Sequence, residues 1–357
     1  MTKLTALFLG LLAVPAVAQN LRIACYDGYA PKDLIERFVA ACKQQHGATV
    51  TVDVRTVGNN QDIYDALRGK QCDVVSPTNN GIKSAKYKMI AAGLLAPIDP
   101  KQIPGYDQLL PALQMADYIT EGGKTYGVPL NYGFYGLAYN TKRVAKPPTS
   151  WAALFEPGAE FAVSDDWFEA LVPVAGMVAG LKGEDLFQLD KLSTPAVRER
   201  LAVLGSRSKR KWVGVDDAKS LQGLQLATSW GFAFSDLAKA GEPWAYATVS
   251  EGMMGYIDSF AIASACEPSA QKVAAWWLAF TIAPEQQAYY LRTIGVKPVS
   301  LATKSQLTPA ELADSKLDDP QWFGRNVTLL RPLDVRTENG LKRLWEEAKT
   351  GSAVPPK

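Results

Sequence analysis

The spacing of apolar and polar positions near the start of the chain predicts a βαβαβ series. Residues 21–25, 49–54 and 72–75 are short apolar or β-branched runs typical of buried strands. A helix is predicted to begin after Pro31, with apolar side chains at helical spacing, and a second helix covers residues 61–68. Strands that alternate with helices predict an α/β fold, with a parallel sheet covered by helices on both faces.

Parallel sheets bind ligands beyond the carboxyl ends of their strands. Two such ends are predicted here, at residues 26–29 and 76–80, and they carry aromatic, carboxylate, hydroxyl and amide groups. Tyr26, Asp27 and Thr78 are therefore candidate ligand-binding residues. Taken alone, the two segments fit ordinary polar turns equally well.

The chain contains one histidine, His46, in the last predicted turn of the first helix and directly before Gly47. A histidine there meets the negative end of the helix dipole, and the glycine is typical of a helix end. Because triads, Cys-His dyads and multi-histidine metal sites would all depend on this one residue, we expect no histidine chemistry.

The first eighteen residues have the pattern of a cleavable signal peptide. A positive start with Lys3 precedes an apolar run over residues 4–14, and residues 16–18 supply small side chains at the cleavage position. No later stretch has eighteen uninterrupted apolar residues. We expect a mature chain that begins at Gln19, is exported to the periplasm and has no stable membrane insertion.

Composition narrows the class of protein. The length of 357 residues suggests about two domains, and 38 basic against 36 acidic residues give a formal charge of +2. A nucleic-acid partner is not expected, because such proteins concentrate positive charge. Neither a GxGxxG nor a GxxxxGK[ST] loop follows any predicted strand. We therefore expect no cofactor and no metal site.

The four cysteines form no CxxC pair, which argues against zinc-ribbon and thioredoxin-like sites. Cys42 is late on the first predicted helix and Cys72 just precedes the third predicted strand, so both fall at the sheet edge opposite the strand carboxyl ends. An exported protein can form disulfides. We predict a Cys42–Cys72 bond, with isolated buried thiols as the alternative.

Several segments downstream resemble a known family. The series 127–130, 136–140 and 149–154 is similar to bacterial extracellular solute-binding proteins of ABC importers. Residues 251–262 carry the strongest likeness, to the spermidine/putrescine-binding group, and residues 229–231 and 293–298 follow. The resemblance extends over nearly the whole mature chain.

The resemblance implies a two-lobed α/β periplasmic binding protein, type II-like, with a ligand cleft between the lobes and a hinge of crossing strands. The crossings are expected near residues 133–139 and 256–260. After the signal peptide (1–18), lobe 1 would comprise residues 19–134 and 258–303. Lobe 2 would comprise residues 135–257 and 304–357.

The resemblance also assigns site residues. The family's aromatic residue after the first strand falls on Tyr26, and its acid two positions later is replaced by Gly28, next to Asp27. Its tryptophan is Trp230, but the acid three residues further on is replaced by Ala233. The candidate carboxylates of the cleft are Glu169, from the acidic segment 164–169, and Asp258. Asp258 stands out because it interrupts an apolar strand, where an uncompensated acid is costly.

The expected function is that of a periplasmic receptor, not an enzyme. It would bind a small cationic amine, polyamine-like, and deliver it to an ABC permease in the inner membrane. Carboxylates would pair with the ammonium groups while aromatic faces hold the methylene stem. The alternatives are a different solute (an amino-acid-like zwitterion, an aminophosphonate or an organic anion) or an exported glycosidase that uses Asp165, Asp166 and Glu169.

Overall fold

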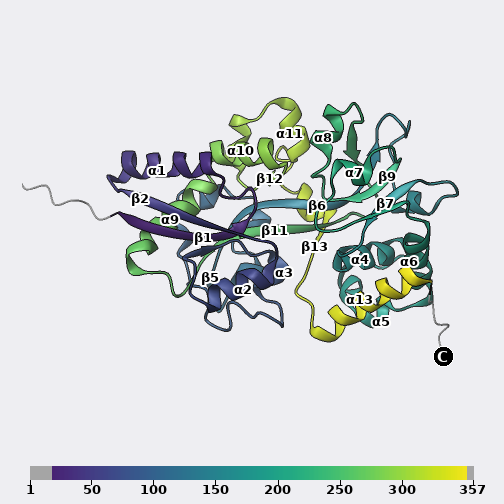
Figure 1. Ribbon diagram of the computed structural model, residues 1–357, viewed down its shortest axis with the longest axis horizontal. Coiled ribbons are helices and arrows are strands. Elements are labelled where there is room, and N and C mark those ends of the chain that lie inside the picture. Colours follow the sequence, from purple (N-terminus) through teal and green to yellow (C-terminus); the bar gives the residue numbers. More distant parts are fainter. Residues whose placement is uncertain (1–17, 352–357) are drawn as a thin grey trace, which may run out of the picture.

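The computed structural model describes residues 18–351 and consists of two α/β halves joined by long strands (Figure 1). In the first half, β1 (Gln19–Tyr26), β2 (Val50–Val57) and β3 (Val74–Val75) alternate with α1 (Lys32–His46) and α2 (Asn60–Arg68). The predicted βαβαβ series is thus confirmed. β1 pairs in parallel with both β2 and β3.

The predicted end of the first helix is also confirmed. α1 ends at His46, and Gly47 adopts a left-handed conformation with φ of 64°, so that its N–H reaches the last carbonyls of the helix. The His46 ring stacks on Trp276, with ring centroids 3.8 Å apart. Trp276 belongs to α9 (Pro268–Thr281), a helix that follows the second crossing strand.

The main sheet runs in the order β2-β1-β3-β11-β6-β9-β7-β8. The antiparallel strands β11 (Met253–Ile262) and β6 (Val128–Asn140) occupy its centre, while β9 (Leu226–Ser229), β7 (Phe161–Ser164) and β8 (Arg210–Trp212) continue it into the second half. β7 pairs in parallel with β8 and with β9. The mixed α/β fold predicted from the sequence is confirmed.

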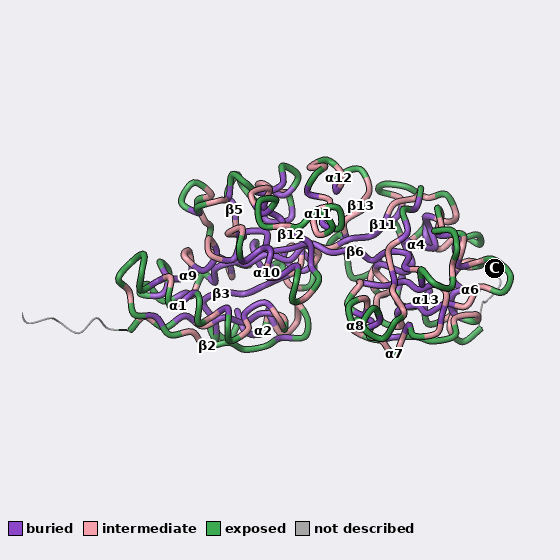
Figure 2. Tube along the Cα trace, turned by 90° about the horizontal axis from the view of Figure 1, so that it is seen from above, coloured by how far each residue is buried: buried purple, intermediate pink, exposed green. Residues whose placement is uncertain are grey.

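The connection between the halves is largely buried. β6 and β11 run side by side through the middle of the molecule (Figure 2), and a third connection, β13 (Val327–Leu329), pairs with the start of β11. The boundaries predicted at 134/135 and 257/258 fall within β6 and β11. The division into lobes itself stays a prediction.

The second half is closed by the C-terminal helix. α13 (Val335–Thr350) packs against α4 (Phe168–Val178) and α6 (Pro195–Arg207) through an apolar face that includes Trp345. The Trp345 indole donates a hydrogen bond of 2.7 Å to the carbonyl of Asp165, just after β7. The last helix therefore fixes the segment that leads into α4.

Shorter elements complete the fold. The helices are α3 (Asn79–Ile82), α5 (Leu189–Leu192), α7 (Ala218–Leu221), α8 (Phe234–Lys239), α10 (Pro284–Ile294), α11 (Pro309–Ser315) and α12 (Trp322–Asn326). The strands are β4 (Thr120–Glu121), β5 (Lys124–Thr125), β10 (Trp244–Tyr246) and β12 (Lys297–Pro298).

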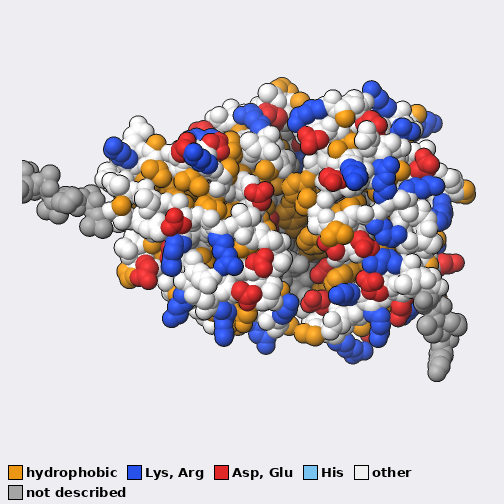
Figure 3. All heavy atoms as spheres, in the orientation of Figure 1, with side chains coloured by type: hydrophobic (Ala, Val, Ile, Leu, Met, Phe, Trp, Pro, Cys, Tyr) orange, Lys and Arg blue, Asp and Glu red, His pale blue; other side chains and the backbone are white. Residues whose placement is uncertain are grey.

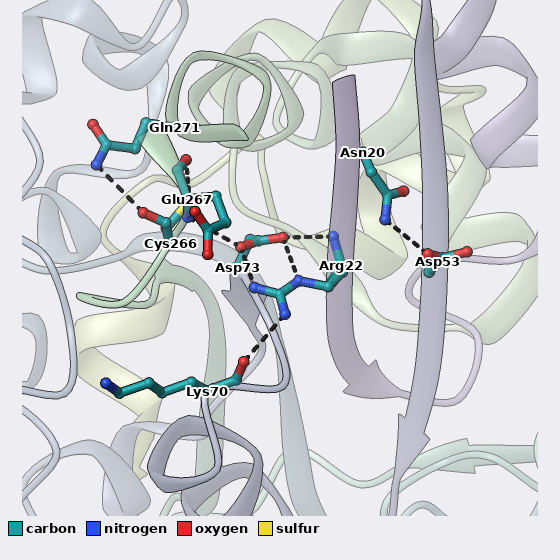
Figure 4. Close-up of polar contacts among 8 residues, drawn as sticks. All are labelled: Asn20, Arg22, Asp53, Lys70, Asp73, Cys266, Glu267 and Gln271. Atoms are coloured by element: carbon teal, nitrogen blue, oxygen red, sulfur yellow. Dashed lines mark hydrogen bonds and ion pairs between the residues drawn. The ribbon is translucent and has the colours of Figure 1, made fainter. Parts of the chain in front are cut away.

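A buried ion pair fixes the edge of the first half that lies opposite the strand carboxyl ends (Figure 4). The Arg22 guanidinium donates to both oxygens of Asp73, at 2.8 and 3.0 Å, and to the carbonyl of Lys70. Burial by itself would raise the pKa of Asp73, but the bonds from Arg22 lower it below the ordinary value. The pair joins β1 to the start of β3.

The predicted Cys42–Cys72 disulfide is wrong, since both cysteines are free and buried, as are Cys25 and Cys266. The buried face of α1 that carries Cys42 also carries Phe38, whose ring contacts Trp277 of α9 at 5.0 Å. This face thus packs against a helix from far along the chain, which the sequence did not predict. Burial raises the pKa of Cys72 to about 12 and that of Cys42 to about 11.

Except for Ala18, the predicted signal peptide lies outside the described residues. Within residues 18–351, no helix is both long and apolar enough to cross a membrane.

Candidate functional site

The carboxyl ends of β1 and β3 lie together beside the crossing strand β11. The Tyr26 backbone N–H donates to the Ser76 hydroxyl at 3.1 Å, and Thr78 forms an isolated β-bridge with Asp258. The Thr78 hydroxyl also accepts a hydrogen bond of 2.6 Å from the Asn60 side chain. Tyr26, Thr78 and Asp258 therefore lie at the same end of the sheet, and their role in binding a ligand stays a prediction.

The turn after β1 requires a glycine at position 28. Gly28 has a positive φ of 80°, and a Cβ atom built there would lie 2.8 Å from the Ile294 side chain. An acidic residue would be strained and would have no space. Asp27, its neighbour, is exposed in this turn.

Asp258 is the most buried acid at these strand ends. The residue is 3% exposed, and its Oδ2 accepts a hydrogen bond from the Tyr29 hydroxyl, which lies 3.3 Å from the Asn131 side-chain oxygen. Its Oδ1 has no hydrogen-bond partner in the described part of the chain. Burial raises the pKa of Asp258 to about 7, although the bond from Tyr29 lowers it in part. A carboxylate oxygen without a partner in this position can accept a positively charged donor.

Aromatic rings extend from Asp258 into the second half. Trp230 contacts Tyr256 edge to face at 5.2 Å and Trp167 at 5.1 Å. The Tyr256 ring lies over Gly133, where a Cβ atom would come within 2.5 Å of it. Gly133 is therefore required for this close approach.

The sequence did not predict the acid that positions Trp230. Asp216, which is buried, accepts hydrogen bonds of 2.7 Å from the Trp230 backbone N–H and 3.2 Å from that of Ala233. It also accepts one of 2.7 Å from the Ser229 hydroxyl. A carboxylate from another segment thus lies against the backbone of Ala233. No local pattern around Asp216 could have indicated this contact.

Glu169 lies in the first turn of α4, two residues after Trp167. Burial, together with the nearby acids Glu338 and Asp166, raises the pKa of Glu169 to about 7. It forms no ion pair within residues 18–351. Among the described residues, no hydrogen bond joins Glu169 to Asp258.

A cavity of about 720 Å³ opens between the two halves along β6. Its walls come from the end of α10 and β12 on one side, and from the segment after β9 together with β10 on the other. Trp230 and Tyr256 line it, whereas Tyr26, Asp27, Thr78, Glu169 and Asp258 do not. Figure 3 shows hydrophobic side chains gathered in a hollow between the halves, with acidic side chains beside it. Within residues 18–351, no group of three or more His, Cys, Asp and Glu side chains could hold a metal ion.

Two α/β halves joined by antiparallel crossing strands are the architecture of the periplasmic-binding-protein fold, which solved structures of this class share. The chain belongs to the bacterial extracellular solute-binding protein family, whose model matches residues 37–317. Family and fold are those of transport solute-binding proteins, not of enzymes.

The known relatives include polyamine binders. The putrescine-binding periplasmic protein SpuD of Pseudomonas aeruginosa is 26% identical over 146 residues, which is 38% of this chain and 37% of that protein. Among solved structures, the spermidine/putrescine substrate-binding protein PotD of Streptococcus pneumoniae matches with a TM-score of 0.77 and 18% identity, covering 93% of this chain and 99% of that one. The maltodextrin-binding protein MalE1 of Lactobacillus casei has a TM-score of 0.68 and 17% identity, covering 94% and 95%.

Proposed function

We propose that this protein is the periplasmic receptor of an ABC importer, and that it binds a small cationic amine, polyamine-like, and delivers it to a membrane permease. One ammonium group would pair with Asp258 and another with Glu169. Trp230 would hold the methylene stem, with Tyr26, Asp27 and Thr78 around the entrance on the first half. The observation that carries the proposal is the unpartnered, buried Oδ1 of Asp258.

The physical argument concerns the cost of burial. A buried carboxylate costs several kcal/mol unless a cation or several donors compensate it. Asp258 receives one donor, the Tyr29 hydroxyl, and Glu169 has no ion-pair partner in the described chain. An alkyl diammonium would supply two charges of the required sign, and its stem would gain contact with aromatic faces.

The relatives support the same solute class. SpuD is named as a putrescine-binding protein, and the pneumococcal PotD as a spermidine/putrescine-binding protein. The likeness to the maltodextrin-binding protein shows that this fold also serves other solutes. For this chain, the unpaired acids favour an amine over a sugar.

An amino-acid-like zwitterion is the second candidate. Ala233 and Gly28 replace acids of the polyamine-binding pattern, and Asp27 is exposed. A solute with a single ammonium group needs one deep carboxylate, and Asp258 provides it.

Closure of the two lobes belongs to the same proposal. The first two crossings stay as predicted from the sequence, within β6 and β11. Arg292 pairs with Glu311 at 2.6 Å and Lys297 pairs with Asp314 at 2.6 Å, so α11 is tied to the segment assigned to lobe 1. We place the third crossing at β13, after residue 326, in place of residue 304.

Isothermal titration calorimetry tests the solute class directly. Putrescine and spermidine should bind one per chain, and γ-aminobutyrate and glutamate should bind weakly or not at all. A ligand at 100 times its dissociation constant adds about 2.7 kcal/mol to the free energy of unfolding, so thermal unfolding gives an independent readout. Binding of γ-aminobutyrate alone would favour the zwitterion, and binding of glutamate alone would reject the cationic solute.

A further inference from the structure

The crossing strands have two faces that carry different chemistry. Directly opposed residues of antiparallel strands share a face, so Asp258 shares one with Asn131, its partner on β6. Lys297 of β12 and Ile257 of β11 are both paired with Tyr132, the next residue of β6, and these three share the other face. Side chains alternate along a strand, and Lys297 therefore lies on the face opposite Asp258.

The cavity of about 720 Å³ opens mainly on the Lys297 face. Along one edge of β6, β12 pairs with residues 131–132 and β9 pairs from residue 136 onward. The part of β6 between these two partners borders the cavity, which Gly133 and Phe134 line. The rings of Trp322 and Tyr246 both contact the Phe134 ring on this face, with ring centroids 5.2 and 6.1 Å from that of Phe134. Its volume and aromatic walls are typical of a small-molecule site.

Two buried donors in the cavity wall have no acceptor. Trp230 and Trp244 are each 7% exposed, and neither indole N–H has a hydrogen-bond partner within the described residues. Buried donors without partners are uncommon, because each one loses its hydration without compensation. A ligand in the cavity that carries acceptor atoms would satisfy such a donor.

The charges of the cavity wall favour an anion. Arg292 is neutralised by Glu311, and Lys297, which is 7% exposed, is neutralised by Asp314. Lys316 also lines the cavity, with its ammonium 5.9 Å from the centre of the Trp322 ring, and forms no ion pair in the part of the chain that the structure describes. The wall therefore carries one excess positive charge beside aromatic surface.

We propose that this cavity is a second ligand site, which binds a small organic anion with a flat apolar body. Aromatic side chains, Trp322 and Tyr246 among them, would pack against the body of the ligand. Lys316 and the indole N–H of Trp244 would bind its carboxylate or sulfonate oxygens. The site goes beyond the proposed amine site, because neither Asp258 nor Glu169 lines it, although the two sites share Trp230 and Tyr256.

Phenylacetate is a suitable probe, and phenethylamine is its cationic counterpart with the same ring. In calorimetry and tryptophan fluorescence, phenylacetate should bind one per chain. Lys316→Gln should weaken it about tenfold or more, because a hydrogen bond to a charged group is lost. Lys316→Arg should retain binding, as should Lys304→Gln, which removes an exposed lysine outside the cavity wall.

Asp258→Asn separates this proposal from the proposed function. It should weaken putrescine and leave phenylacetate unchanged, since Asp258 does not line the cavity. Trp244→Phe should also weaken phenylacetate, provided that its circular dichroism melt matches the parent protein. Absence of phenylacetate binding, equal binding by Lys316→Gln, or tighter binding by Asp258→Asn would each overturn the second site. Loss of putrescine binding alone would leave it intact.

Discussion

Replacing Asp258 by asparagine keeps the shape of the side chain and removes its charge. In the unliganded protein, burial raises the pKa of Asp258 to about 7 from an ordinary value of 3.8. The folded state therefore holds this proton more tightly than the unfolded state, and its contribution to stability is greatest below pH 4. That contribution is lost as the pH rises toward 7. At 1.36 kcal/mol per pKa unit, the loss amounts to about 4 kcal/mol.

The asparagine variant lacks this titration. Measured by urea unfolding without solute, its stability relative to the parent protein should increase by up to about 4 kcal/mol between pH 4 and pH 8. Asp107→Asn, which alters an exposed acid, should give no such trend. A stability difference that does not vary with pH would refute the assignment of Asp258 as an uncompensated buried acid.

Solute affinity should change in the opposite direction. Loss of one partner of a buried charge pair costs about 2–5 kcal/mol, or roughly thirtyfold to several thousandfold in the dissociation constant for putrescine. In the parent protein a cation must displace the proton, so affinity should fall about thirtyfold from pH 8 to pH 5.5 through Asp258. Calorimetry at both pH values tests this. An asparagine variant that binds putrescine as tightly as the parent would remove Asp258 from the site.

Three further predictions concern other parts of the molecule. Glu169→Gln should weaken putrescine binding about fivefold to thirtyfold at pH 8, a smaller loss than at Asp258 because Glu169 is less buried, and should reduce the dependence of binding on pH. Unchanged calorimetric titrations would contradict its role. Asp73→Asn should lower the free energy of unfolding by about 2–3 kcal/mol, because Arg22 loses its partner, and should leave solute affinity unchanged. Asp53→Asn, at an exposed position, is the control in urea unfolding. Reducing agent should not shift the melting temperature, because all four cysteines are free; a shift of several degrees would indicate a disulfide.

The first half could be predicted from sequence because its signals are local. The spacing of apolar residues after Pro31 and the His46-Gly47 end define α1 without reference to other segments. Asp258 was a candidate because a single acid within an apolar strand is recognisable. That strand became β11, and its acid is buried.

Contacts between distant segments could not be predicted. The Tyr29 hydroxyl reaches Asp258 because β1 and β11 lie in one sheet, and Asp216 holds Trp230 through hydrogen bonds across a loop. The false disulfide has the same origin. The spacing of Cys42 and Cys72 gave no indication that α9 packs against α1, the helix that carries Cys42.

The order of strands in the sheet has a consequence for biosynthesis. β3 has its antiparallel partner in β11, which is made only after all of β6 to β10, and β13 completes the same region later still. The first half therefore cannot pair this edge of β3 until β11 has been made. Such late, distant pairing slows folding. A fragment that ends before β11 would leave this edge of β3 without its partner.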